Sequence, residues 1–274
     1  MSVFEFERVT YHYPGDLVGV EEVSFRIEAG ESIALLGANA SGKSTLLYLM
    51  DGLYFPQRGA VRAFGRELTE RALEAEGFGR AFRRQVGLLF QNSEAQLFST
   101  TVEEELAFGP LQLGLSADEV RRRVDDTLTL SGIEHLRSRS PQALSGGEKK
   151  RVAVASLLTL APSVLLLDEP TSGLDPRSLQ ALLELLAALR GRGLTLVTAT
   201  HDLSVAPELA ERAIVLSEAH RVARDAPVAE VLQDMNLLLE VNLIHAHAHA
   251  HGSITHVHPH PHVAYHDHEH EHGS

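Results

Sequence analysis

Hydrophobic and polar positions alternate along the N-terminal part of the chain. Val23, Phe25 and Ile27 are each followed by a polar residue, and the pattern ends at an Ala-Gly pair. A period of two predicts a strand with one buried face, and similar short runs up to residue 65 predict an N-terminal antiparallel β region. Residues 32–36 (SIALL) are instead a short apolar run, which is typical of a buried strand. A glycine-containing loop and a predicted helix over 44–50 follow it.

Further along, the pattern changes to helical periods and then to alternating strands and helices. Apolar runs at 164–167 and 195–198 predict two more buried strands, and a leucine-rich helix is expected between them at 179–189. The order strand, helix, strand predicts a mostly parallel sheet and therefore an α/β fold. A mostly helical insert, about 92–162, is expected inside it. Its predicted helices are 102–108, 116–130 and 147–160.

Composition narrows the class of protein. The 274 residues are 44% hydrophobic and 22% charged, which is typical of a globular protein. A formal charge of −13 disfavours nucleic acid as a partner, because binding it needs a basic surface. The absence of cysteine excludes disulfides, thiolate zinc sites and cysteine nucleophiles. The longest apolar stretch, residues 152–167, is interrupted by Ser, Thr and Pro, so we expect no membrane span, which needs about 20 apolar residues.

Residues 37–44 (GANASGKS) match the phosphate-loop pattern G-x-x-x-x-G-K-[ST] between a predicted buried strand and a predicted helix. Backbone N–H groups of such a loop bind phosphates, Lys43 would neutralise the β- and γ-phosphates, and Ser44 would bind Mg²⁺. Lysine is rare in this chain, with three residues against 21 arginines, and one of the three lies in this loop. A compact ammonium fits there, whereas a planar guanidinium does not. The loop therefore predicts nucleotide binding.

Two carboxylates, Asp168 and Glu169, directly follow the predicted strand at 164–167. In an open α/β sheet, ligands bind at this end of the strands. Asp168 could hold Mg²⁺, and Glu169 could take a proton from the attacking water. An ordinary acidic turn would be the simpler interpretation of this pair alone, but the phosphate loop favours a catalytic site.

Residues 144–148 (LSGGE) predict a second anion-binding helix N-terminus. One nucleotide does not need two such sites, so the arrangement makes sense if the second closes on a nucleotide held by another subunit. These residues resemble the signature of the ATP-binding cassette (ABC) ATPases, which begins LSGG. The resemblance covers essentially residues 1–240, which we take as one ABC ATPase domain with a P-loop core.

The resemblance implies roles for further residues. Tyr13, in preference to Tyr11, matches the aromatic residue that stacks on adenine, and Gln91 matches the glutamine that senses Mg²⁺ and the attacking water. Asp175, in the segment 172–175 (SGLD), matches the loop that communicates across the dimer, and His201 matches the switch histidine that contacts the γ-phosphate.

The candidate site follows from these matches. One departure from the family pattern is Ala40, where glycine is common, although a small residue should still fit. The catalytic candidates are Glu169, His201 and Gln91. The candidates for ATP binding are Tyr13, Gly37, Ala38, Asn39, Ala40, Ser41, Gly42, Lys43, Ser44 and Thr45; for contact with the partner's ATP, Ser145, Gly146, Gly147 and Asp175; and for Mg²⁺, Ser44, Gln91 and Asp168.

Other segments resemble one subgroup of the family. Residues 91–98 (QNSEAQLF), 107–110 (AFGP) and 236–244 are similar to the ATPases of energy-coupling-factor (ECF) transporters, although generic amphipathic helices would be an alternative interpretation. The subgroup imports vitamins or transition metals. The resemblance implies a second ABC ATPase subunit, a transmembrane coupling subunit and a substrate-binding membrane subunit as partners. It places the chain peripherally on the cytoplasmic face of the cell membrane.

The C-terminal segment, residues 241–274, is a low-complexity tail that holds twelve of the sixteen histidines in its last 30 residues, and we expect it to be poorly ordered without a ligand. Neutral imidazole suits nickel, cobalt, copper and zinc. An expression tag or a solvated linker would be the alternatives, but the mixture with Ala, Thr, Val and Pro favours metal binding. The candidate ligands are His245, His247, His249, His251, His266, His268, His270 and His272.

The sequence therefore predicts an ATP-hydrolysing subunit, with ATP and Mg²⁺, that powers import of a transition metal ion, most simply nickel or cobalt. The same ATPase serving a vitamin or another ECF-type substrate is one alternative. A metal-storage or regulatory ATPase is the other.

Overall fold

The computed structural model describes residues 1–251 and 254–261. In the body of the molecule, two sheets face each other across α1 (Lys43–Met50). The smaller sheet is antiparallel, with the order β2-β1-β4-β5. This is the predicted N-terminal β region. Its strands are β1 (Ser2–Tyr13), β2 (Leu17–Glu28), β4 (Arg58–Ala63) and β5 (Arg66–Glu67).

The larger sheet has the order β10-β9-β3-β8-β7-β6, and all its neighbours are parallel except β10 and β9. Every residue of β3, β6, β7 and β8 is buried, because helices or the other sheet cover both faces. The short apolar runs of the sequence are thus the central strands of an α/β fold, as predicted. The strands are β3 (Ser32–Leu36), β6 (Val86–Leu89), β7 (Val164–Asp168), β8 (Thr195–Thr200), β9 (Arg212–Leu216) and β10 (Val222–Pro227).

Alternate residues of these strands enter different hydrophobic cores. Ile33 and Leu35 of β3 belong to the core shared with the antiparallel sheet, whereas Leu36 packs with the C-terminal helices. Leu165 and Leu167 of β7 face the core beneath the helical insert. The residues that follow β3 and β7 are therefore fixed between packed layers, which positions the phosphate loop and the two carboxylates.

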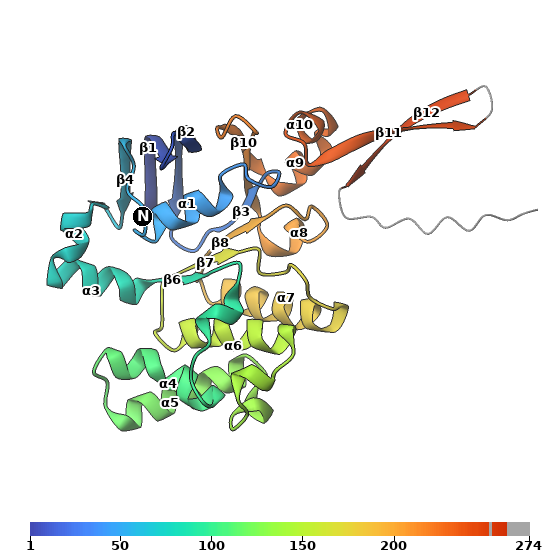
Figure 1. The fold of residues 1–274 in the computed structure, drawn as a ribbon. Helices are drawn as coiled ribbons and strands as arrows, with labels where there is room; N and C mark the ends of the chain where they lie inside the picture. Colours follow the sequence, from blue (N-terminus) through green and yellow to red (C-terminus); the bar gives the residue numbers. More distant parts are fainter. Residues whose placement is uncertain (252–253, 262–274) are drawn as a thin grey trace, which may run out of the picture.

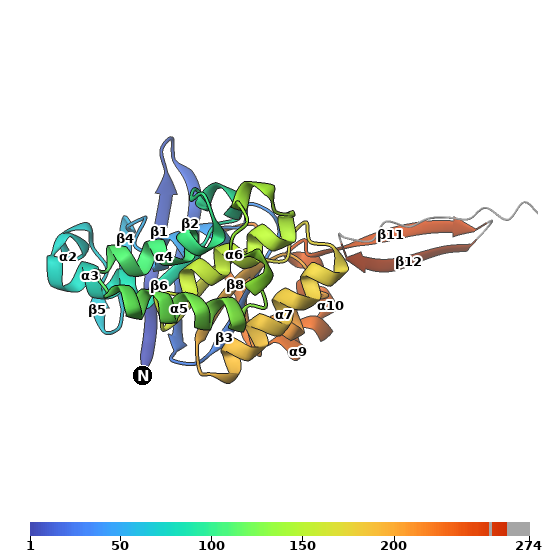
Figure 2. The ribbon, with the colours of Figure 1, turned by 90° about the horizontal axis from the view of Figure 1, so that it is seen from below.

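Helices alone connect β6 to β7, an interval whose residues are all described, and they agree with the predicted insert. The three α-helices among them lie side by side (Figure 2). The helices of the insert are η1 (Ser93–Gln96), α4 (Val102–Gln112), α5 (Ala117–Leu130), η2 (Glu134–Leu136), η3 (Pro141–Ala143) and α6 (Gly146–Leu158). The predicted leucine-rich helix is α7 (Pro176–Gly191). The remaining helices are α2 (Glu70–Glu74), α3 (Glu76–Gln85), α8 (Ala206–Leu209), α9 (Val228–Gln233) and α10 (Met235–Glu240).

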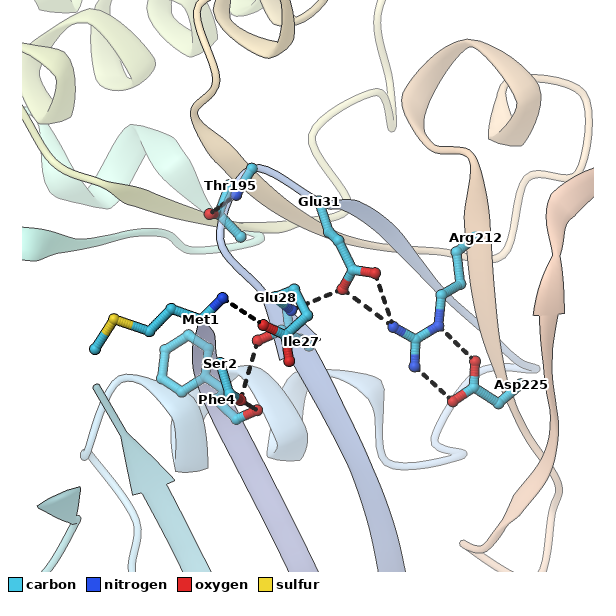
Figure 3. A network of polar contacts seen from close by, with 10 residues as sticks. Met1, Ser2, Phe4, Ile27, Glu28, Glu31, Thr195, Arg212 and Asp225 are labelled. Carbon is cyan, nitrogen blue, oxygen red and sulfur yellow. Dashed lines mark hydrogen bonds and ion pairs between the residues drawn. The ribbon is translucent and has the colours of Figure 1, made fainter. Parts of the chain in front are cut away.

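A polar network joins the two sheets at the N-terminal end of β3, the end opposite the phosphate loop (Figure 3). The Glu31 carboxylate accepts a hydrogen bond of 2.8 Å from the Glu28 backbone N–H and contacts the Arg212 guanidinium at 3.1 Å. Arg212 also donates to both oxygens of Asp225, at 2.7 and 2.8 Å. The terminal amine of Met1 contacts Glu28 at 2.8 Å. The start of β1, the β2–β3 turn and the β9–β10 pair are thereby held together.

The packed domain extends beyond residue 240. Val241, Leu243 and Ile244 are buried in the core formed with α9 and α10, so the boundary is four residues later than the sequence suggested. Beyond it, β11 (Ile244–His251) and β12 (Ile254–Pro261) pair as an antiparallel hairpin that leads away from the body (Figure 1). The sequence did not predict these strands. Whether the tail is poorly ordered without a ligand remains a prediction, and residues 252–253 and 262–274 lie outside the described residues.

Candidate functional site

The phosphate loop connects β3 to α1, in the predicted context. Gly42, just before α1, has φ +107°, and a Cβ there would lie 2.4 Å from the backbone oxygen of Gly19. Only glycine fits such a close approach. Ala40 has φ +64°, a left-handed conformation that favours glycine. The structure therefore accommodates this departure from the family pattern at a cost of about 1 kcal/mol.

Lys43 lies inside the loop. Its ammonium donates to the backbone oxygens of Gly37 and Ala38 at 2.8 and 3.0 Å and is 3.9 Å from Oε1 of Glu169. Burial lowers its pKa, and the carboxylates of Glu169 and Asp168 oppose that shift. A buried ammonium held by weak carbonyl acceptors is well placed to exchange them for phosphate oxygens.

Ser44 and Asp168 form a pair with the composition of a magnesium site. Oγ of Ser44 donates to Oδ1 of Asp168 at 3.0 Å, whereas Oδ2 of Asp168 is buried without a hydrogen-bond partner among the described residues. Burial raises the pKa of Asp168, which the hydrogen bond from Ser44 partly offsets. Hydroxyl and carboxylate oxygens are ligands that Mg²⁺ prefers, and the unpartnered oxygen is free to bind it. The two residues therefore fit this cation.

Glu169 is the first residue after β7 and has φ +47°. Its backbone N–H donates to Ala199 at 3.0 Å, and its carboxylate is buried. Oε1 lies 2.8 Å from Nδ1 of His201, and Oε2 accepts a weaker bond from Thr200 at 3.4 Å. The predicted carboxylate and histidine therefore meet, although they come from two different strands. This pair can accept a proton from a water molecule and hold the orientation of both groups.

Lys150 is a residue of this site that the sequence interpretation missed. It projects from α6, is buried, and donates to the backbone oxygens of Glu169 and Ser172 at 3.3 and 2.9 Å. Burial lowers its pKa. The scarcity of lysine in the chain was a signal for it, but the spacing between residues 150 and 169 gives no indication of contact.

A cavity of about 470 Å³ lies above the phosphate loop. Tyr13 lines it and shares a hydrogen bond of 2.9 Å with the hydroxyl of Thr45. Tyr11 is not among the lining residues and stacks on Tyr54 with ring centroids 4.9 Å apart, which favours Tyr13 as the aromatic residue for a base. A larger cavity of about 650 Å³ lies elsewhere, between the N-terminus and residues 158–163.

Glu218 and His220 also line the cavity above the loop. They lie in the turn between β9 and β10, which the sheet order places beside β3 and the phosphate loop. Their positions follow no motif, so the sequence alone gave no signal for them.

The candidates for contact with a partner's nucleotide lie at two adjacent helix starts. Ser145 caps α6 with a reciprocal capping box: its Oγ accepts from the Glu148 N–H at 3.3 Å, and its own N–H donates to the Glu148 carboxylate at 2.9 Å. Ser145 and Gly146 are exposed. A Cβ on Gly147 would lie 2.2 Å from Oγ of Ser178, so α6 packs closely on α7 there.

Asp175 caps α7 in turn, accepting from the backbone N–H groups of Arg177 and Ser178 at 3.0 and 3.1 Å. The hydroxyl of Ser178 also donates to its carboxylate at 2.6 Å, and this hydrogen bond, followed by the backbone ones, lowers the pKa of Asp175. The predicted helix starts are therefore formed and adjacent.

The structure does not bring every candidate to the loop. Gln91 is exposed, and in the described part of the chain it has no hydrogen bond to Ser44 or Asp168. The side chain of the nearby Gln96 instead stabilises the backbone around the end of β6. It accepts a hydrogen bond from the Phe90 N–H and donates one to the Leu88 oxygen, both at 3.1 Å.

The structure describes the backbone of only four of the eight candidate metal-binding histidines in the tail. The backbone of His245, His247, His249 and His251 lies in β11, whereas His266, His268, His270 and His272 lie outside the described residues. Among residues whose side chains the structure describes, no group of three or more His, Asp or Glu could hold a metal ion.

The phosphate loop follows the buried parallel strand β3, and two carboxylates lie at the end of β7, which is separated from β3 in the sheet by β8. This arrangement defines a P-loop nucleotide hydrolase. The chain belongs to the ABC transporter family, whose profile matches residues 20–172, and it is an ATPase of that family. No helix of the described residues is long and apolar enough to cross a membrane.

Two relatives named as metal import ATP-binding proteins are similar over most of the chain. The nickel import ATP-binding protein NikO of Rhodobacter capsulatus is 47% identical over 244 residues, which is 88% of this chain and 95% of that protein. The cobalt import ATP-binding protein CbiO of the same organism is 43% identical, with coverage of 86% and 83%.

Solved structures share the fold. The CbiO1 protein of Clostridium perfringens, part of the ABC transporter complex CbiONQ, is 34% identical with a TM-score of 0.77, covering 88% of this chain and 95% of that one. A dimeric ATP-binding cassette in a post-hydrolysis state with ADP and Pi is 29% identical with a TM-score of 0.72, covering 82% and 98%.

Proposed function

We propose that this ATPase powers a membrane transporter that imports a transition metal ion, nickel or cobalt. The observation that carries the proposal is the 47% identity to a nickel import ATP-binding protein across 88% of the chain, together with the similarity to a cobalt import protein. The histidine-rich tail supports the same cargo, because imidazole is a good ligand for both metals.

In the proposed mechanism, two ATPase subunits enclose two ATP molecules. Each ATP lies between the phosphate loop of one subunit and residues 145–147 of the other. Two observations support this arrangement. Ser145 and Gly146 are exposed and can therefore contact another subunit. The two helices that would bind phosphate also pack in different places, because α6 packs on α4 and α7 whereas α1 packs on β7 and β8. Helix N-termini from both subunits would then stabilise the phosphate charges. The partner is a second copy of this chain or a related ATPase.

The chemistry would use the residues assembled after β7 and β8. Glu169 accepts a proton from the attacking water, and its contact with His201 orients both side chains. Lys43 would exchange its loop carbonyls for phosphate oxygens, and Ser44 and Asp168 would hold Mg²⁺. When bound, Mg²⁺ neutralises the charge on the β- and γ-phosphates. Gln91 would join the site only when the helical insert moves toward the loop.

A surface on the helical insert is suited to the membrane partner. Phe98 and Phe108 are 63% and 43% exposed and meet edge to face, with centroids 4.8 Å apart. Phe108 also lines a groove of about 430 Å³ with Leu73 and Arg83. Exposed aromatic side chains beside a groove mark interaction sites on otherwise polar surfaces. We assign this surface to a helix of the transmembrane coupling subunit, which holds the ATPase on the cytoplasmic face of the membrane.

The tail would serve as a metal buffer or sensor, because a subunit of this kind lines no channel. The alternative cargoes and roles, a vitamin or a storage and regulatory function, predict different partners.

Affinity purification from native membranes distinguishes them. The protein carries an N-terminal tag without histidine, and co-purified proteins are identified by mass spectrometry. We expect a transmembrane coupling protein together with a small metal-binding membrane subunit. A vitamin-binding subunit would overturn the cargo, and the absence of any membrane partner would overturn the transport role.

A further inference from the structure

The turn between β9 and β10 is fixed at the wall of the nucleotide cavity. The backbone oxygen of His220 accepts a hydrogen bond of 2.9 Å from the Glu21 N–H in β2, and the His220 N–H donates to the Ser217 oxygen at 3.0 Å. A Cβ on Gly37 would lie 2.9 Å from the Leu216 oxygen, so the start of the turn packs directly on the first residue of the phosphate loop. The side chains of the turn are therefore held beside a bound nucleotide.

Glu218 brings a carboxylate to this cavity, and a residue from the C-terminal part of the domain orients it. Nδ2 of Asn242 donates to Oε1 of Glu218 at 3.0 Å. Asn242 follows α10 with φ +56°, a left-handed conformation that asparagine adopts more readily than most residues. Glu218 is exposed, and its Oε2 has no hydrogen-bond donor among the described residues. The carboxylate thus keeps one oxygen available for a ligand.

The lining of the cavity indicates which part of a nucleotide this oxygen would meet. The loop binds the phosphates and Tyr13 is the candidate for the base, so the ribose that joins them lies between. Apart from Tyr13 and the loop, the described lining consists of Leu17, Val18, Gly19, Glu218 and His220. A carboxylate only accepts hydrogen bonds, and ribose offers two hydroxyl donors. In dinucleotide-binding folds, an acidic side chain likewise binds a ribose hydroxyl.

We propose that Glu218 accepts hydrogen bonds from the ribose hydroxyl groups of the bound nucleotide, with Asn242 as its positioning residue. The carboxylate then selects ribonucleotides over nucleotides that lack these hydroxyls. A hydrogen bond to a charged group at an exposed site favours the ribonucleotide roughly tenfold. The inference rests on nucleotide binding at the phosphate loop and does not depend on the transported cargo.

The test compares equilibrium binding of ADP and of dideoxy-ADP, which lacks both ribose hydroxyls, to the full-length protein. ADP is not hydrolysed during the measurement, and the two nucleotides carry the same charge, so their affinity ratio cancels any general electrostatic effect. The variants are Glu218→Ala and Asn242→Gly, since glycine keeps the left-handed backbone but removes the amide. The charge-matched control is Glu22→Ala, because Glu22 is exposed, pairs with Arg221 and is not among the lining residues.

We expect the wild type and Glu22→Ala to favour ADP about tenfold and Glu218→Ala to bind both nucleotides about equally. Asn242→Gly should give an intermediate ratio, and a wild-type ratio would overturn its positioning role. A ratio near one in the wild type, or an unchanged ratio in Glu218→Ala, would overturn the ribose contact.

Inosine diphosphate, in which an oxygen replaces the amino group of adenine, is the second probe. We expect Glu218→Ala to leave the affinity ratio of ADP to inosine diphosphate unchanged. A change in that ratio would place the carboxylate at the base and overturn the proposal. A wild-type protein that binds no ADP would overturn the nucleotide cavity itself, whereas the membrane partners test the proposed cargo separately.

Discussion

The chemistry of the site depends on a few individual contacts around Glu169. Its left-handed backbone is fixed through Ala199, its carboxylate meets His201, and its backbone oxygen accepts from Lys150. The carboxylate could be predicted from its place after an apolar strand. Lys150 could not, because its contact forms only when α6 packs beside β7. Glu218 and His220 were unpredictable for a similar reason, since the sheet order brings their turn to the phosphate loop.

Replacing Glu169 by glutamine should separate binding from hydrolysis. The amide keeps the size of the side chain but cannot accept the proton, so we expect turnover to fall about 10²–10⁴-fold while ATP binding is retained. Steady-state phosphate release and equilibrium binding of labelled ATP measure the two properties. Unchanged turnover would refute Glu169 as the base.

Among the elements, the helices of the insert were predicted well because their boundaries have local signals. Ser116 and Ser145 cap α5 and α6, and acidic residues occupy both first turns. Helices α2 and α3 were not predicted. Gly77 and Gly79 weaken the helical signal of α3 in the sequence. The helix is stabilised by the packing of Phe78 and Phe82 against the core shared with the antiparallel sheet.

Ser145 and Ser116 offer a matched pair of caps. Each Oγ accepts from the third residue of its helix at 3.3 Å, but only Ser145 is expected to face a partner's ATP. Alanine at either position should cost about 1 kcal/mol of stability through loss of the cap. We expect Ser145→Ala alone to weaken ATP-dependent dimerisation, measured by analytical ultracentrifugation with a hydrolysis-deficient background. Equal dimerisation of the two variants would contradict the role of α6 in the partner's site.

The C-terminal end of α1 carries an unfavourable charge. Burial raises the pKa of Asp51 to about 7, although Arg83 opposes the shift. The carboxyl also lies at the negative end of the helix dipole. The pKa of Asp51 in the folded protein is above its ordinary value of 3.8, so the folded state favours the protonated carboxyl. At low pH the group is protonated in both the folded and the unfolded states, and no penalty arises. Ionisation then destabilises the fold progressively as the pH rises from about 4 to 7.

Asp51→Asn should remove this penalty. We expect the variant and the wild type to differ least near pH 4, and the variant to be more stable by up to about 4 kcal/mol at pH 8. Urea unfolding at several pH values gives the difference. A stability difference that shrinks with rising pH would show that the ionisation of Asp51 does not oppose folding.

At the scale of the whole molecule, the fold divides into a nucleotide-binding core, a helical insert with an exposed aromatic surface, and a histidine-rich hairpin. The first two could be predicted, since their motifs are local and occur in a fixed order. The extension of the packed domain to Ile244 could not, because only tertiary contact with α9 and α10 makes Val241 and Leu243 part of a core.

The central claim is that ATP hydrolysis by this chain drives metal import. The most direct measurement is uptake of radioactive nickel and cobalt by cells of the native organism in which the chromosomal copy encodes Glu169→Gln. Wild-type cells provide the control. We predict that the variant cells accumulate the protein normally at the membrane but lose high-affinity uptake of one of the two metals. Normal uptake of both metals in the variant cells would contradict the account.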